Sequence, residues 1–107
     1  MIFDADGELV LALTSGTNRV DGDKLAVLAG VSMCGRADVD DVRRHTGYAI
    51  GGVPPFGHDN PVRTWIDPLL LTLDVVWGAA GTPRHVFPIA PADLVRITGA
   101  IEADFCA

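Results

Sequence analysis

The sequence predicts a mixed α/β fold organised as a single domain. Short apolar runs with a strand pattern alternate with short helical patterns along the whole chain. The connections between them are too short and irregular for regular βαβ crossovers, which favours antiparallel or mixed strands. With 107 residues, 49% of them hydrophobic, the chain is large enough for one packed core but not for two.

The first half of the chain contains two expected strands and two expected helices. Glu8–Leu13 is an apolar run typical of a buried strand, and DADGE predicts a tight turn before it. DKLAVLAG predicts a helix that ends at Gly30, and VSMCGRA predicts a second strand. Asp38 can cap a helix through VDDVRRHT, which Gly47 ends.

The second half continues this alternation. VRTWI has the alternation of a strand, and in DPLLLTL Asp67 precedes Pro68, which is typical of a helix start. DVVWGAAG predicts a buried strand that runs into a glycine turn, and RHVFPI predicts a further strand. APADLVRITG predicts a last helix with Pro91 in its first turn and Gly99 at its end.

Charge, hydropathy and cysteine content exclude several classes of protein. Eight Lys and Arg residues stand against fourteen Asp and Glu, a formal net charge of −6, so any contact with nucleic acid must be local. No apolar run reaches the roughly 18 residues of a membrane span, and the start has no basic signal-peptide region. We therefore expect a soluble, cytoplasmic protein with no membrane partner. Cys34 and Cys106 lack metal-ligand spacing, and we expect no disulfide and a buried free thiol at Cys34.

One segment, TGYAIGGVPPFGH at positions 46–58, departs from an ordinary connecting loop. It holds four glycines and two consecutive prolines and ends on a histidine. Glycines let a backbone approach a ligand closely, and prolines fix φ angles so that amide donors are in place before a substrate arrives. The alternative is that the glycines only form turns and that Pro54 and Pro55 only break a strand.

This segment, followed by TWID, LLL and VVWGAAGTPRHVFPIAPADLVRITGA, resembles the YbaK/EbsC family of aminoacyl-tRNA editing domains. That family is related to the insertion domain of prolyl-tRNA synthetase and to free-standing prolyl-tRNA deacylases. LALTSGTNRVDGDKLAVLAG also matches the family, so the resemblance covers essentially the whole chain, residues 1–107, as one domain. It implies a twisted, barrel-like mixed sheet flanked by short helices.

The resemblance implies an editing hydrolase that cleaves the ester of mischarged tRNA in trans, such as Ala- or Cys-tRNA(Pro). The implied partners are the acceptor end of tRNA and, as a further candidate, an aminoacyl-tRNA synthetase. The family is not known for metal dependence, and no metal or cofactor is expected. The alternative is a non-catalytic paralogue that binds the aminoacyl end of tRNA or a similar small ligand.

The resemblance also assigns site residues. In the family the glycine–proline loop lines the pocket for the aminoacyl group, and its amides hold the substrate and help position a water. Gly51 and Gly52 would then supply the carbonyl or oxyanion donors, and His85 lies where some members carry a functional histidine. The residues assigned to substrate binding are Tyr48, Val53, Pro54, Pro55, Phe56, Gly57, His58, Asp67, Gly78 and Gly81.

Simpler roles remain open for several side chains. His58 can equally be a solvated loop residue, and a helix N-cap fully explains Asp67. Trp65 and Trp77 could stack on an adenine, although core packing is the preferred interpretation for both because each has apolar neighbours in a strand-like run.

The family's functional lysine matches no residue of this sequence. It lies in a family strand that would place it just before Met1, so we expect a domain truncated at its N-terminus, with Lys24 as a solvated surface charge. An absent strand would leave Glu8–Leu13 with an unpaired edge, through which the chain could form a homo-oligomer.

Overall fold

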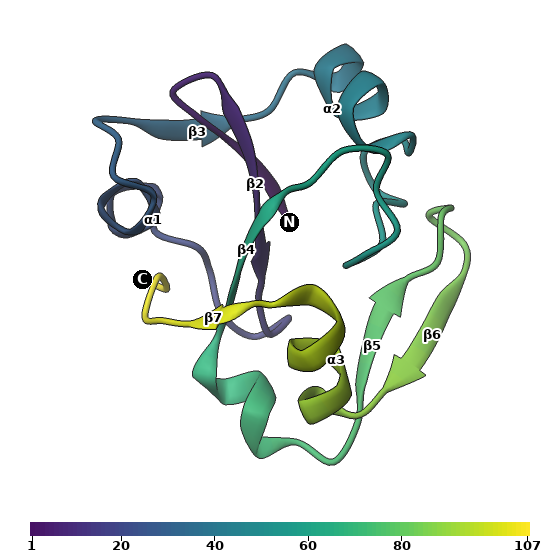
Figure 1. The fold of residues 1–107 in the computed structure, drawn as a ribbon. Helices are drawn as coiled ribbons and strands as arrows, with labels where there is room; N and C mark the ends of the chain where they lie inside the picture. Colours follow the sequence, from purple (N-terminus) through teal and green to yellow (C-terminus); the bar gives the residue numbers. More distant parts are fainter.

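The structure is a computed structural model that describes residues 1–107, with a mixed sheet, a separate β-hairpin and four short helices (Figure 1). The strands are β1 (Ile2–Ala5), β2 (Glu8–Leu13), β3 (Cys34–Arg36), β4 (Arg63–Ile66), β5 (Val76–Ala79), β6 (Val86–Ile89) and β7 (Ile101–Glu102). The helices are α1 (Gly22–Ala29), α2 (Val39–Thr46), the 3-10 helix η1 (Pro68–Thr72) and α3 (Pro91–Thr98).

The five-stranded sheet has the order β3-β1-β2-β4-β7. β1 pairs antiparallel with β2 and β3, whereas β2 with β4 and β4 with β7 are parallel pairs. β5 and β6 form an antiparallel hairpin of their own, which lies beside α3 and apart from the sheet (Figure 1). The mixed α+β fold predicted from the sequence, with short helices around a mixed sheet, is confirmed.

The first two strands are joined by a two-residue turn, Asp6-Gly7. Both turn residues have positive φ, 53° at Asp6 and 99° at Gly7, as a type I′ turn requires. The turn predicted at DADGE is therefore confirmed. It folds β1 back along β2, and β4 pairs with β2 on its other side. The expected unpaired edge at Glu8–Leu13 is consequently wrong, because β2 lies inside the sheet and the edge strands are β3 and β7.

Capping residues set the ends of the helices. The Asp38 carboxylate accepts hydrogen bonds from two amides of the first turn of α2, and Gly47 ends that helix with φ of 85°. Gly30 and Gly99 end α1 and α3 in the same left-handed conformation. The helix expected in DPLLLTL is only the 3-10 segment η1, which has no buried residue to stabilise further turns. None of the helices combines the length and the apolar character needed to cross a membrane.

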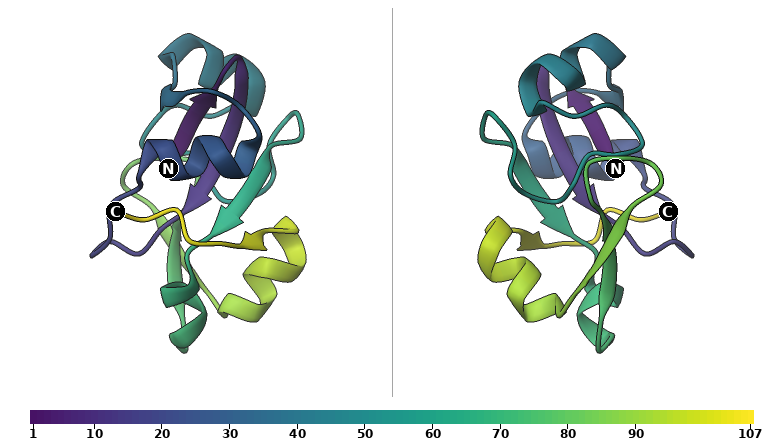
Figure 2. Two further views of the ribbon diagram at one scale, coloured as in Figure 1. Left: turned by 90° about the vertical axis from the view of Figure 1, so that its left-hand side faces the viewer. Right: turned by 90° about the vertical axis from the view of Figure 1, so that its right-hand side faces the viewer.

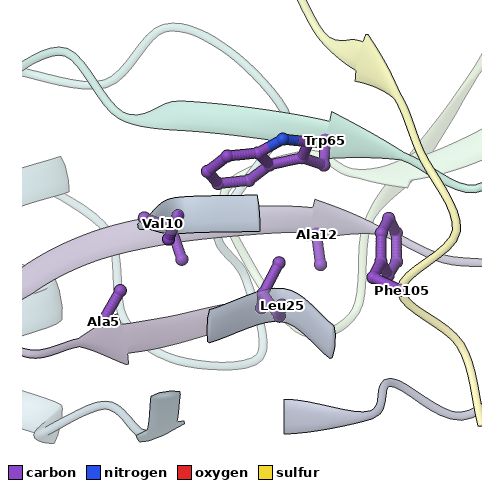
Figure 3. Close-up of a cluster of buried hydrophobic side chains, with 7 residues drawn as sticks. Ala5, Val10, Ala12, Leu25, Trp65 and Phe105 are labelled. Carbon is purple, nitrogen blue, oxygen red and sulfur yellow. The ribbon is translucent and has the colours of Figure 1, made fainter. Parts of the chain in front are cut away.

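Two faces of the sheet carry separate parts of the core. On one face, side chains of β1, β2 and β4 pack against α1 and the C-terminal segment (Figure 3). The left view of Figure 2 shows α1 lying across this face of the sheet. The residues of this cluster are Ala5, Val10, Ala12, Leu25, Ala29, Trp65 and Phe105. On the other face, Leu9 packs with Val42 of α2, and Leu13 packs beside a cluster formed by β4, β5 and α3. Leu11 of β2 points to this second face between the two clusters, because side chains alternate along a strand.

The two tryptophans have different environments. Trp65 is 4% exposed in the core, as predicted, but core packing is wrong for Trp77, which is 64% exposed. The physical reason is that side chains alternate along β5, so Val76 packs against the domain while Trp77 points to the opposite, open face. The buried strand expected in DVVWGAAG is thus buried only at Val76. Cys34 and Cys106 are free thiols, and Cys34 is half-buried rather than buried.

Candidate functional site

The glycine–proline segment between α2 and β4 is a closed loop, residues 47–58. The Asp59 amide donates to the Thr46 carbonyl at 3.1 Å, and the Asn60 amide donates to the His45 carbonyl at 3.2 Å. The Asn60 side-chain amide donates to that His45 carbonyl as well, at 2.9 Å. Ends held together in this way are typical of a compact Ω loop. The loop therefore leaves the sheet and returns to it as one unit.

The loop packs against the turn of the β5–β6 hairpin through direct backbone contact. The Gly81 amide donates to the Gly52 carbonyl at 3.0 Å. A Cβ added at Gly52 would lie 2.8 Å from Thr82 Cα and 2.9 Å from the Gly81 carbonyl carbon. The Tyr48 ring also packs against this turn, because a Cβ added at Gly81 would lie 3.4 Å from it. Glycine at position 52 is thus required for the close approach of the loop backbone to the backbone of the hairpin turn.

The two glycines assigned as donors differ in the state of their amides. The Gly52 N–H donates to the Ala49 carbonyl at 3.0 Å and is already satisfied. The N–H groups of Gly51 and Val53 donate to no group of the chain. Gly51 also has φ of 95°, a left-handed conformation that favours glycine. Of the two predicted donors, only Gly51 therefore has an amide available to a ligand.

Two adjoining pockets border the loop. The first, of about 370 Å³, lies between β2, the loop, η1 and the hairpin, and we call it the hairpin pocket. The second, of about 870 Å³, extends to β3 and α2, and we call it the β3 pocket. The residues that line both pockets are Met1, Leu11, Val53 and Ala79. Gly51 lines the β3 pocket, and Pro55 and Gly78 line the hairpin pocket. The two pockets therefore form one continuous depression along the loop.

A third pocket, of about 260 Å³, lies on the other side of the loop against α3. Its lining includes Phe56, Gly57 and His58. Pro55 separates it from the hairpin pocket, because this residue lines both.

The charge around these pockets contrasts with that of the whole chain. The sequence has fourteen Asp and Glu residues, but none of them lines any of the three pockets. The hairpin pocket has no charged side chain, and the only one in the β3 pocket is Arg36, which forms no ion pair. The linings of the three pockets therefore present no carboxylate to an anionic ligand, although the chain carries a formal net charge of −6.

The histidines near the loop are held by protein atoms. His58 Nε2 lies 2.7 Å from the Pro54 carbonyl oxygen, so its ring closes the loop from within. His85 Nδ1 lies 2.6 Å from Thr82 Oγ1 on the exposed hairpin turn, and His85 lines none of the three pockets. No group of three or more His, Cys, Asp or Glu side chains is placed to hold a metal ion.

Asp67 supports a wall of the hairpin pocket from behind. Its carboxylate accepts hydrogen bonds from the Asn18 side chain at 2.7 Å, the Leu69 amide at 3.0 Å and the Ser15 amide at 3.4 Å. The side chain is 4% exposed and does not line the pocket, whereas Ser15 does. Burial raises the pKa of Asp67, but these hydrogen bonds outweigh burial and lower the pKa below its ordinary value.

The family of the chain follows from a comparison with known proteins. Residues 1–97 match the family model described as the aminoacyl-tRNA editing domain. The chain belongs to this family. The resemblance seen in the sequence is thereby confirmed at the level of the editing domain, and the free Gly51 amide lies in the loop that carried it.

Several solved structures are similar to this editing domain. A candidate trans-editing enzyme for prolyl tRNA synthetase is 41% identical, with a TM-score of 0.93, and the match covers 100% of this chain and 68% of that one. A structure from work on computational grafting of epitope backbones onto scaffold proteins is 39% identical over the same shares, also with a TM-score of 0.93. The hypothetical protein APE2540 is 29% identical, with a TM-score of 0.85 and shares of 100% and 71%.

The editing domain brings only part of the predicted residue set together. Gly51, Val53, Pro55 and Gly78 lie around the two adjoining pockets. The other predicted residues lie behind the loop, at the hairpin turn, in the third pocket or beneath η1. They are Tyr48, Gly52, Pro54, Phe56, Gly57, His58, Asp67, Gly81 and His85.

Sequence reasoning missed the residues that complete the pockets. They include Met1, Leu11, Ser15, Arg36 and Ala79, as well as Trp77, for which core packing was preferred, and they come from segments far apart in the chain. Most are small or apolar and carry no local signal of a site. Only Trp77 offered one, as an aromatic residue that could stack on a base.

Proposed function

We propose that this editing domain hydrolyses the ester bond of mischarged tRNA in trans, with the aminoacyl group in the hairpin pocket beside the glycine–proline loop. The observation that carries the proposal is the free Gly51 amide on a rigid loop, at the edge of a depression that contains no carboxylate. Family membership supports the same reaction class.

The chemistry requires stabilisation of a developing negative charge. Water adds to the ester carbonyl carbon, the carbonyl oxygen becomes an oxyanion, and the bond to the ribose oxygen then breaks to leave the free amino acid and the tRNA hydroxyl. The N–H groups of Gly51 and Val53 are available as donors to this oxygen. Because the Ω loop is closed by hydrogen bonds and contains two prolines, these donors need little reorganisation during the reaction.

The lining of the hairpin pocket supports a small, uncharged side chain on the misattached amino acid. Twelve of its seventeen lining residues are hydrophobic and none is charged, so a charged side chain would lose its hydration there without gaining a partner. Alanine and cysteine meet this description. The similarity to a candidate trans-editing enzyme for prolyl tRNA synthetase supports tRNA(Pro) as the carrier.

A second candidate function is binding without turnover. It is favoured by one observation, that no lysine lines the three pockets. The single lysine, Lys24, donates instead to the Cys106 carbonyl at 2.8 Å, and it lies on α1, which covers the opposite face of the sheet. A binding module would keep the pockets and the loop while lacking this cation.

The test is a deacylation assay with Ala-, Cys- and Ser-tRNA(Pro), with correctly charged Pro-tRNA(Pro) as the control. The expected result is release of alanine or cysteine faster than in buffer, while the proline ester survives. Tight binding of a non-hydrolysable alanyl-adenosine amide with no release above the buffer rate would support the binding module. Failure to bind this analogue and to release any amino acid would contradict both functions.

A further inference from the structure

Trp77 is a large aromatic side chain left in solvent. It is 64% exposed, whereas Trp65 is 4% exposed. Its neighbours along the chain, Leu73 and Val75, are each 44% exposed and line the hairpin pocket with it. These residues therefore form an open apolar surface that continues the pocket. The proposed reaction at the loop gives this surface no role.

Trp77 lies at the rim of the hairpin pocket. Side chains alternate along a strand, so Val76 and Gly78 share one face of β5 while Trp77 and Ala79 share the other. A Cβ at Gly78 would lie 3.2 Å from the Phe87 ring and 3.3 Å from Pro55, so this face packs against the loop. All four residues line the hairpin pocket, but Val76 is 7% exposed whereas Trp77 is 64% exposed. Trp77 therefore borders the pocket from its solvent-exposed side.

We infer that Trp77 is the stacking platform for the base of the 3′-terminal adenosine of the tRNA. The inference rests on the proposed function: an amino acid held in the hairpin pocket is esterified to that adenosine, which must then lie at the pocket mouth. An indole offers a flat apolar face to a base, and base–aromatic stacking needs no hydrogen-bond readout.

Charge favours a nucleotide at this position. No carboxylate lines the hairpin pocket or the adjoining β3 pocket, so no acidic side chain of the lining repels the phosphate on the 5′ side of the adenosine. The single charged side chain of the depression, Arg36, is positive and has no acidic partner. A second copy of the chain, at a net charge of −6, would bring acidic residues to the same surface.

The test compares two ligands on three variants by calorimetry. The ligands are a non-hydrolysable alanyl-adenosine amide and alanine methyl ester, which lacks the nucleoside. Trp77→Ala removes the stacking face and Trp77→Phe keeps an aromatic ring. Val27→Ala, on α1 at the opposite face of the sheet, removes an apolar side chain that is 79% exposed and serves as a control.

Trp77→Ala is expected to lower the affinity for the alanyl-adenosine amide about 5- to 150-fold, and the affinity of Trp77→Phe should lie between those of Trp77→Ala and the wild type. Val27→Ala should leave this affinity unchanged, and Trp77→Ala should weaken binding of the methyl ester much less than binding of the alanyl-adenosine amide. If the wild type binds alanyl-adenosine and Trp77→Ala binds it equally well, the inference is wrong and the proposed function stands. If the wild type binds neither ligand, both the inference and the proposed function are wrong. A wild-type dimer that Trp77→Ala dissociates, with nucleoside affinity unchanged, assigns the surface to a second copy and overturns the inference.

Discussion

Replacing Gly52 by alanine should separate the glycine–proline loop from the β5–β6 hairpin. The new Cβ would lie 2.8 Å from Thr82 Cα and 2.9 Å from the carbonyl carbon and oxygen of Gly81. Cβ atoms do not approach other heavy atoms below 3.0 Å, and every one of these neighbours is a backbone atom. Relief therefore requires a backbone shift, which would also lengthen the 3.0 Å hydrogen bond from the Gly81 amide to the Gly52 carbonyl.

The magnitude follows from these two terms. Overpacking of a closely packed contact costs about 1–3 kcal/mol, and the weakened hydrogen bond adds about 1 kcal/mol. The free energy of unfolding should thus fall by about 2–4 kcal/mol, which for a domain of this size lowers the melting temperature by about 10 °C or more. The same shift moves Gly51 and its free amide, so deacylation should fall with stability.

Two other glycines provide matched controls. Gly51 has φ of 95°, and a Cβ there would make only an ordinary contact, 3.6 Å from Pro83, so Gly51→Ala should lose about 1–2 kcal/mol from backbone strain alone. Gly35 has neither positive φ nor a neighbour within 4 Å, so Gly35→Ala should be neutral or slightly stabilising.

The assay is thermal and urea unfolding followed by circular dichroism, with the expected order of stability Gly35→Ala, Gly51→Ala, Gly52→Ala. Because the clash is with backbone, adding Thr82→Ala should not rescue Gly52→Ala. The reasoning is refuted if Gly52→Ala melts within about 2 °C of Gly35→Ala, or if truncating Thr82 restores the melting temperature.

Three further outcomes are expected. The pKa of Asp67 in the folded state lies below its ordinary value of 3.8, so its contribution to stability should be complete above pH 3.8 and should disappear as the pH falls through the lower, folded-state pKa. Acid unfolding curves of the wild type and Asp67→Asn should converge at that low pH. A stability difference between the two proteins that persists at that pH would contradict this. Glu8→Gln should lose less than about 1 kcal/mol in urea unfolding, because the two hydrogen bonds from Arg63 to Glu8, both 2.8 Å, lie in a half-exposed pair. Arg36→Gln should weaken tRNA binding and lower its salt dependence by about one phosphate contact, and an unchanged salt slope in filter binding would show that Arg36 touches no phosphate.

Local signals determined much of the chain before any tertiary contact was considered. The turn at Asp6-Gly7, the cap at Asp38 and the helix ends at Gly47 and Gly99 all appear where the sequence predicted them. Each of these features depends on backbone hydrogen bonds and φ preferences within a few residues, which the local sequence contains. The glycine–proline loop was recognisable for the same reason, because its exceptional residues are consecutive.

Tertiary structure alone decided which of these residues face a pocket. β2 is interior because Arg63–Ile66, more than fifty residues away, pairs along it, and no local pattern encodes that partner. Trp77 is exposed because it lies on the face of β5 opposite to the buried Val76, although its apolar neighbours suggested a core position. The Gly52 amide is satisfied within the loop while the Gly51 amide is free, a difference between adjacent identical residues. Sequence signals report short-range conformation, whereas burial, strand order and free donors depend on contacts between segments that are distant along the chain.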